Sequence, residues 1–165
     1  MSLLSKIQEL LSIWFPNKTQ DQTNYNNWMD AFIGTDNGNL IIFPITDSDE
    51  KTIDTTMQSL CTLSYDFIIT FDYYPTNTWE WFYFYIGSSV IVLSSSYDKG
   101  SNFGLTSLGY NKWISVEIKY INGTVTASSG TQTQTQSINV TYPVEIKYYG
   151  NKTGTKIRNV ERRVL

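Results

Sequence analysis

The stretch that decides the fold runs Trp79-Glu80-Trp81-Phe82-Tyr83-Phe84-Tyr85-Ile86. Alternate side chains of a β-strand point to opposite sides, so this run predicts two different faces. One face would enter a core and carries Phe82, Phe84 and Ile86. The other would line a surface and carries Trp79, Trp81, Tyr83 and Tyr85. Because Tyr and Trp combine flat apolar area with a hydrogen-bonding edge, that surface suits either ligand binding or a packing interface.

Alternating apolar positions and turn residues predict further short strands on both sides of this run. The expected strands cover 40–43, 63–73, 90–93, 113–121, 125–128, 144–148 and 156–164, and Trp113 is expected in the core. Asn122-Gly123 is a strong hairpin signal, because both residues accept positive φ. The segments 46–56 and 94–108 are expected to be loops. The Thr/Gln tract Gly130–Ser137 fits either an exposed strand or a mobile loop. Many short strands with little helix indicate an all-β sandwich or barrel.

The first residues have a different pattern. Apolar side chains at helical spacing predict an amphipathic helix within residues 1–16, followed by a polar linker or edge segment at 17–27 and the β domain at 28–165. This helix would either pack on its own domain or join copies of the chain into a homo-oligomer. Its apolar positions are Leu3, Leu4, Ile7, Leu10, Leu11 and Trp14.

Charge and hydropathy exclude several classes of protein. The net charge is −3, and the basic residues form no long run, so no nucleic-acid partner is expected. No apolar segment approaches the roughly 20 residues of a membrane span, which argues against membrane insertion. The N-terminus lacks the pattern of a signal peptide, because Lys6 and Glu9 interrupt it.

Residue types that are absent narrow the chemistry further. The 165 residues contain no histidine and one cysteine, Cys61. Without histidine the chain lacks the Ser-His and Cys-His nucleophile arrangements, the usual zinc ligands and the commonest neutral-pH base. We therefore expect a protein that is not an enzyme and that uses no cofactor.

Three stretches resemble the concanavalin A-like lectin/glucanase superfamily, the jelly-roll sandwich shared by laminin-G-like domains. They are Phe82–Gly87 as a strand running into a tight turn, Asn111–Ile118 with Asn122-Gly123-Thr124-Val125 as a hairpin, and Lys156–Val160 as a closing strand that pairs back beside the first. The resemblance implies an antiparallel jelly-roll β-sandwich over 28–165 and a carbohydrate ligand. The short N-terminal helix before a Thr/Gln/Asn-rich β domain also resembles phage receptor-binding and tail proteins.

Carboxylates and turn residues allow two other kinds of site. Retaining and inverting glycosidases use pairs of Asp or Glu, and Tyr142-Pro143-Val144-Glu145 resembles the first catalytic strand of small jelly-roll xylanases. The second glutamate motif of that family is absent, so Glu117 and Glu145 are expected to be solvated sheet positions. Calcium would use the Asp47, Asp49 and Asp54 loop or Asp98 with Asn102. Neither loop has a calcium-ligand pattern, so no metal is expected.

The sequence favours a phage- or virus-like structural or adhesion protein that recognises cell-surface carbohydrate. Its location would be the virion or the cell surface. Two alternatives stay open: a free-standing carbohydrate-binding module or lectin, and a jelly-roll glycoside hydrolase. The expected ligand-binding residues are Trp79, Trp81, Tyr83, Tyr85, Tyr97, Asp98 and Asn102.

Overall fold

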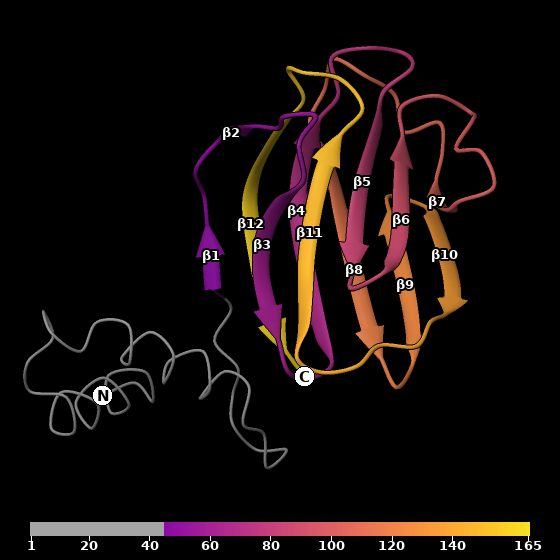
Figure 1. Cartoon of the computed structure of the whole chain (residues 1–165). Coiled ribbons are helices and arrows are strands. Elements are labelled where there is room, and N and C mark those ends of the chain that lie inside the picture. The colour runs from indigo at the N-terminus through magenta and orange to yellow at the C-terminus, as the bar shows by residue number, and fades with distance from the viewer. Residues whose placement is uncertain (1–44) are drawn as a thin grey trace, which may run out of the picture. The chain divides into compact units, whose positions relative to one another are not determined.

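A computed structural model describes residues 45–165, and this part of the chain consists of β-strands in two layers (Figure 1). The predicted helix within 1–16, the segment 17–27, the domain start at 28 and the strand over 40–43 lie outside the described residues. The strands are β1 (Ile45–Asp47), β2 (Lys51–Thr52), β3 (Gln58–Leu63), β4 (Phe67–Tyr74), β5 (Trp81–Ile86), β6 (Ser89–Ser94), β7 (Phe103–Leu105), β8 (Ile114–Ile121), β9 (Thr124–Ser129), β10 (Gln132–Ser137), β11 (Val144–Gly150) and β12 (Lys156–Val164).

The strands form two sheets that pack face to face. Sheet A has seven strands in the order β1-β12-β4-β8-β9-β10, with β2 also paired to β12, and sheet B has five in the order β3-β11-β5-β6-β7. Among the described strands, β6 and β7 pair in parallel, and the other pairs are antiparallel. The all-β, two-sheet sandwich expected from the sequence is confirmed for these residues.

The core lies between the inner faces of the two sheets. β4 buries every second residue from Phe67 to Tyr73, and β5 does the same from Phe82 to Ile86. Phe71 stacks on Phe84 across the two layers, with ring centroids 5.7 Å apart and planes 10° from parallel. Burying such a side chain contributes about 1.5–3 kcal/mol to the free energy of folding. Burial of the alternate side chains of β4 and β5 therefore does much to hold the two sheets together.

Two turns with positive φ define the strand order β8-β9-β10. Asn122 and Gly123 have φ values of 48° and 78°, which fits the two-residue hairpin predicted between β8 and β9. Gly130, with φ 56°, begins the next turn, after which residues 132–137 pair with β9 in continuous register. Of the two interpretations of the Thr/Gln tract, the exposed strand is therefore the one observed.

Three segments differ from the sequence predictions. The expected loop 46–56 overlaps the end of β1 and contains β2, and both short strands pair with the long strand β12. The strand expected over 63–73 begins at Phe67 as β4, whereas Leu63 is the last residue of β3 in the other sheet. The expected loop 94–108 contains β7, which pairs with β6 where Gly104 faces Val92. A Cβ on Gly104 would lie 1.8 Å from the Val92 carbonyl oxygen, so only glycine allows this approach.

Candidate functional site

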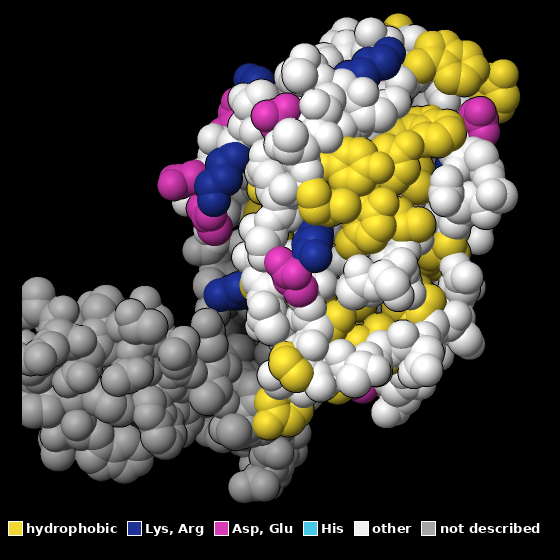
Figure 2. Space-filling model, viewed as in Figure 1, with side chains coloured by type: hydrophobic (Ala, Val, Ile, Leu, Met, Phe, Trp, Pro, Cys, Tyr) yellow, Lys and Arg dark blue, Asp and Glu magenta, His cyan; other side chains and the backbone are white. Residues whose placement is uncertain are grey.

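The outer face of sheet B carries the aromatic residues singled out in the sequence. Phe82, Phe84 and Ile86 of β5 point into the core, whereas the alternate residues Trp81, Tyr83 and Tyr85 are half-buried on the outside. Figure 2 shows hydrophobic side chains gathered in one patch over β5 and β11, with charged side chains at its border.

A tyrosine from the neighbouring strand completes this group. β11 pairs Tyr149 with Tyr83, and the two rings stack with centroids 4.5 Å apart and planes 10° from parallel. The Tyr85 ring also lies beside Tyr149, with ring centroids 6.0 Å apart and planes at 21°. Burial, a hydrogen bond with Tyr85 and the nearby phenols raise the pKa of Tyr149 to about 12. Stacking covers the facing sides of the Tyr83 and Tyr149 rings, so these two sides are closed to a ligand.

Aromatic rings that are open to solvent lie in the loops near the first residue of β5. Trp79 and Tyr97 are 49% and 76% exposed and meet edge to face at 5.5 Å. Trp81 lies between Trp79 and Tyr83 in the sequence, and its ring meets the Tyr83 ring at 6.1 Å and 63°. We call these six residues the aromatic face: Trp79, Trp81, Tyr83, Tyr85, Tyr97 and Tyr149.

An asparagine in the turn between β11 and β12 holds the Trp79–Trp81 backbone. The Trp81 N–H donates to the Asn151 Oδ1 at 2.8 Å, and the Asn151 Nδ2 donates to the Trp79 carbonyl at 3.4 Å. The Asn151 N–H in turn donates to the Trp81 carbonyl at 2.9 Å. One residue thus fixes the backbone on both sides of Glu80, which determines how both tryptophans are presented.

Glu80 anchors the same segment from the inside. It is 1% exposed, and its carboxylate accepts the Thr76 N–H at 2.9 Å and the Thr76 hydroxyl at 3.1 Å. Its own N–H donates to the Ser95 Oγ at 3.0 Å. Burial raises the Glu80 pKa, and the hydrogen bonds from Thr76 only partly offset this. The Glu80 side chain therefore closes the loop that carries Trp79.

Two of the predicted ligand residues shape their own loop. The Asp98 carboxylate accepts the Gly100 N–H at 2.7 Å, and the Asn102 Nδ2 donates to the Lys99 carbonyl at 3.0 Å. A Cβ on Gly100 would lie 3.7 Å from the Trp81 ring, so this loop runs beside the aromatic face. The structure therefore brings Tyr97 to the aromatic face, while Asp98 and Asn102 act on the loop conformation.

The outer face of sheet A contains a groove of about 620 Å³ that the sequence did not predict. Its polar lining comes from β4, β8, β9 and β12 and includes Thr70, Asp72, Ser115, Glu117, Ser128, Asn159 and Glu161. The strand register places Glu161, Thr70 and Glu117 in one row across three strands. Two strand spacings separate the Glu117 and Glu161 backbones by about 10 Å.

Asp72 is the electrostatic centre of this groove. It accepts hydrogen bonds from the Ser115 hydroxyl and from the Asn159 Nδ2, the latter at 2.9 Å. The Arg158 Nε lies 3.6 Å from the same carboxylate. Burial acts to raise the Asp72 pKa, but these hydrogen bonds and the arginine charge outweigh it, so the pKa is lowered. Asp72 is therefore a negatively charged carboxylate held in place by its hydrogen bonds.

An aromatic pair lies on the same face as Asp72. Tyr74 is two residues after Asp72 in β4, and Trp113 directly precedes β8. Trp113 meets Tyr74 edge to face at 5.3 Å, and the Arg158 guanidinium lies 3.9 Å from the Trp113 ring centroid. Trp113 is half-buried, so the prediction that it belongs to the core is wrong. The side chain points away from the sandwich interior because Ile114, the next residue, begins the inward set of β8.

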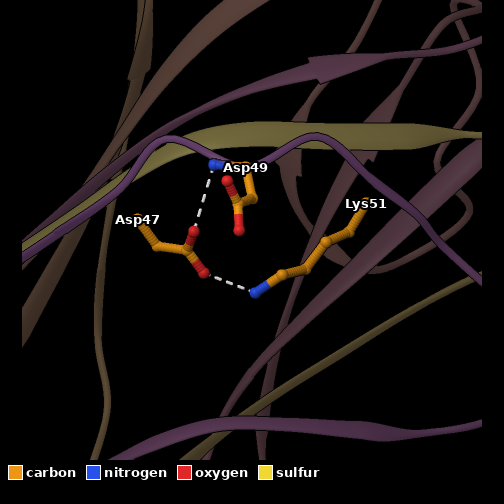
Figure 3. A network of polar contacts seen from close by, with 3 residues as sticks. All are labelled: Asp47, Asp49 and Lys51. Carbon is orange, nitrogen blue, oxygen red and sulfur yellow. Dashed lines mark hydrogen bonds and ion pairs between the residues drawn. The ribbon is translucent and has the colours of Figure 1, made fainter.

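The acidic loop considered for calcium is held by a lysine. The Asp47 carboxylate accepts the Asp49 N–H at 3.1 Å and pairs with the Lys51 ammonium (Figure 3). This ion pair lowers the Asp47 pKa. Among residues 45–165, no group of three or more His, Cys, Asp or Glu side chains is arranged to hold a metal ion. Within the same range, no helix is long and apolar enough to cross a membrane.

Comparison with known proteins identifies the fold. No protein-family model matches the chain, and no curated protein matches its sequence. The structure is similar to that of A. japonicus CB05 (TM-score 0.54, 12% identity) and to the fructosyltransferase of A. japonicus (TM-score 0.53, 13% identity). Each match covers 74% of this chain but 26% of the other, so the chain spans about a quarter of those proteins. Galectin-Ib of Xenopus laevis matches less well (TM-score 0.48, 8% identity, covering 70% of this chain and 100% of the galectin).

These matches support the predicted jelly-roll class at the level of the fold and correct one expectation. The sequence analysis expected a protein that is not an enzyme, because histidine is absent. That expectation is contradicted, since a fructosyltransferase contains a sandwich of this fold. Absence of histidine does not exclude an enzyme, because carboxylate pairs can act on sugars without it. The fold also gathers Asp72, Glu117 and Glu161 in one groove, which the sequence did not reveal.

Proposed function

We propose that this protein binds a carbohydrate chain along the aromatic face of sheet B. The observation that carries the proposal is the row of aromatic side chains from Trp81 through Tyr83 to Tyr149, with the open Trp79–Tyr97 pair in the loops near its start. From Trp81 to Tyr85 the extended strand β5 covers about 13 Å, which is the length of about two or three sugar rings, and Trp79 lies in the turn before it. The two-sheet sandwich fits carbohydrate binding in the manner of a lectin or binding module.

The two parts of the aromatic face have different chemistry. The exposed faces of Trp79 and Tyr97 would stack on the apolar face of a pyranose ring, as open aromatic rings do with flat apolar partners. The hydroxyl edges of Tyr83, Tyr85 and Tyr149 would exchange hydrogen bonds with sugar hydroxyl groups. The phage or virus setting expected from composition has no support among the matched structures named above, and the proposal does not depend on it.

A glycan array followed by calorimetry on the best ligand tests this proposal. Trp79→Ala with Tyr97→Ala is expected to lower affinity at least tenfold while the fold stays intact. The matched control is Trp113→Ala, which removes a tryptophan from the opposite sheet. Loss of binding in the Trp113 variant alone would assign the ligand to the outer face of sheet A. A wild type that binds no glycan on the array would refute the proposal.

A second candidate function is sugar cleavage in the groove of sheet A. It is favoured by the row Glu161–Thr70–Glu117, because inverting glycosidases hold two carboxyl groups about 6.5–9.5 Å apart with room for a water molecule. Glu145, which the sequence analysis compared with a xylanase residue, lies on the other sheet and pairs with Lys147 at 2.9 Å.

Release of reducing ends from a panel of polysaccharides tests this second function. Activity that disappears in Glu117→Gln and in Glu161→Gln, but persists in the control Glu145→Gln, would support it. Absence of activity in the wild type on the polysaccharide that the array identifies as ligand would reject it.

A further inference from the structure

The Thr/Gln tract forms an edge strand without the usual protection against pairing. β10 is the terminal strand of sheet A, at the border of the sandwich (Figure 1). Its residues from Thr133 to Ser137 are all exposed, on both faces of the strand. Edge strands of monomers are normally blunted by charged residues, proline or a β-bulge. Residues 132–137 contain no charge and no proline, and their register with β9 is unbroken.

The register shows which backbone groups are available at this edge. The Ile138 N–H donates to the Gly123 carbonyl at 2.9 Å, so residue 138 bonds toward β9. In an antiparallel pair, bonded and non-bonded positions alternate. Backbone hydrogen bonds to β9 are therefore also made by Gln132, Gln134 and Gln136. The N–H and C=O groups that point away from β9 belong to Thr133, Thr135 and Ser137. These outward groups form a row that a further strand can pair with.

The tract is complementary to itself. If a second copy of β10 is laid antiparallel about Thr135, that residue faces its own copy, Thr133 faces Ser137, and Gln134 faces Gln136. Hydroxyl side chains then lie opposite hydroxyl side chains, and amides opposite amides, which are favourable cross-strand pairs. No like charges meet. A charged peptide would find no countercharge in this tract, and an apolar peptide would find polar side chains on both faces of the strand.

We propose that two copies of the chain pair their β10 strands antiparallel about Thr135, joining two copies of sheet A into one continuous sheet. Such a contact is isologous, because the same surface serves both partners around a two-fold axis. It involves one short strand from each copy, so the dimer fraction should rise with protein concentration. The contact is separate from the oligomerisation expected through the N-terminal helix, and it does not depend on the proposed carbohydrate site.

Analytical ultracentrifugation of the full chain over an about thousand-fold concentration range tests the proposal. The wild type is expected to pass from monomer to dimer. Thr135→Pro should remain monomeric, because it removes an outward N–H that β9 does not use and places a ring at the contact. Thr135→Val is the matched control, since it keeps the N–H and the strand propensity, and it should dimerise. A wild type that stays monomeric, or a dimer that persists in folded Thr135→Pro, would overturn the proposal.

Disulfide trapping gives a readout that does not require the proline variant to fold. In the proposed register the two cysteines of Thr135→Cys face each other across the contact, within disulfide range. In Ser137→Cys each new cysteine faces Thr133 of the other copy, so the two cysteines lie about four residues apart along the strands. Under mild oxidation the Thr135 variant should form covalent dimer at least tenfold faster than the Ser137 variant. Equal rates for the two variants would contradict the register and the proposal with it.

Discussion

Replacing Asn151 with alanine should loosen the part of the aromatic face that presents the two tryptophans. The Trp81 N–H loses its acceptor at 2.8 Å, and the Trp79 carbonyl loses a longer contact at 3.4 Å. A typical hydrogen bond contributes a net 0.5–1.5 kcal/mol, and the longer contact adds little, so the expected loss is about 1 kcal/mol. In a protein of this size that corresponds to a fall in Tm of about 3 °C.

Calorimetry and NMR together test this prediction. The indole N–H signals of Trp79 and Trp81, assigned with Trp→Phe variants, should shift and broaden in Asn151→Ala. Asn151→Asp keeps an oxygen to accept the Trp81 N–H but lacks the donor to Trp79, so it should disturb the Trp79 signal more than the Trp81 signal. Asn139→Ala, at an exposed asparagine outside this turn, is the control. If Asn151→Ala leaves both the Tm and the two indole signals unchanged, the argument that this amide positions the tryptophans is wrong.

Two further predictions concern stability. Gly104→Ala should detach β7 from β6, because the new Cβ would lie 1.8 Å from the Val92 carbonyl oxygen. We expect the free energy of unfolding, measured in urea, to fall by about 3 kcal/mol or more. A variant that unfolds at the same urea concentration as the wild type would contradict this. Glu80 has a folded-state pKa above its ordinary value of 4.5, so its contribution to stability is fully present below that value and is lost as the pH rises through the folded pKa. The free energies of unfolding of Glu80→Gln and the wild type, measured from pH 4 to 8, should therefore diverge in favour of the variant as the pH rises, and a constant difference would show that Glu80 does not titrate as inferred.

The sequence alone determined which side chains of a strand lie on the same face. The period-two patterns of β4, β5 and β8 correctly separated the buried residues, such as Phe71, Phe84 and Ile118, from the outward ones. The Asn122-Gly123 hairpin was equally predictable, because the φ values it requires depend on these two residues themselves. Patterns of this kind are local: they depend on the direction of successive side chains and not on which strand lies alongside.

The pairing of strands depends on tertiary packing, and both candidate sites depend on that pairing. Tyr149 stacks on Tyr83 because β11 pairs with β5 in one register, and a slip by one residue would have turned it inward. The groove of sheet A exists because β12 returns beside β4, bringing Glu161 into line with Glu117. Pairing between distant segments is set by the balance of the whole core and its connections, so no local pattern around these residues could have indicated it.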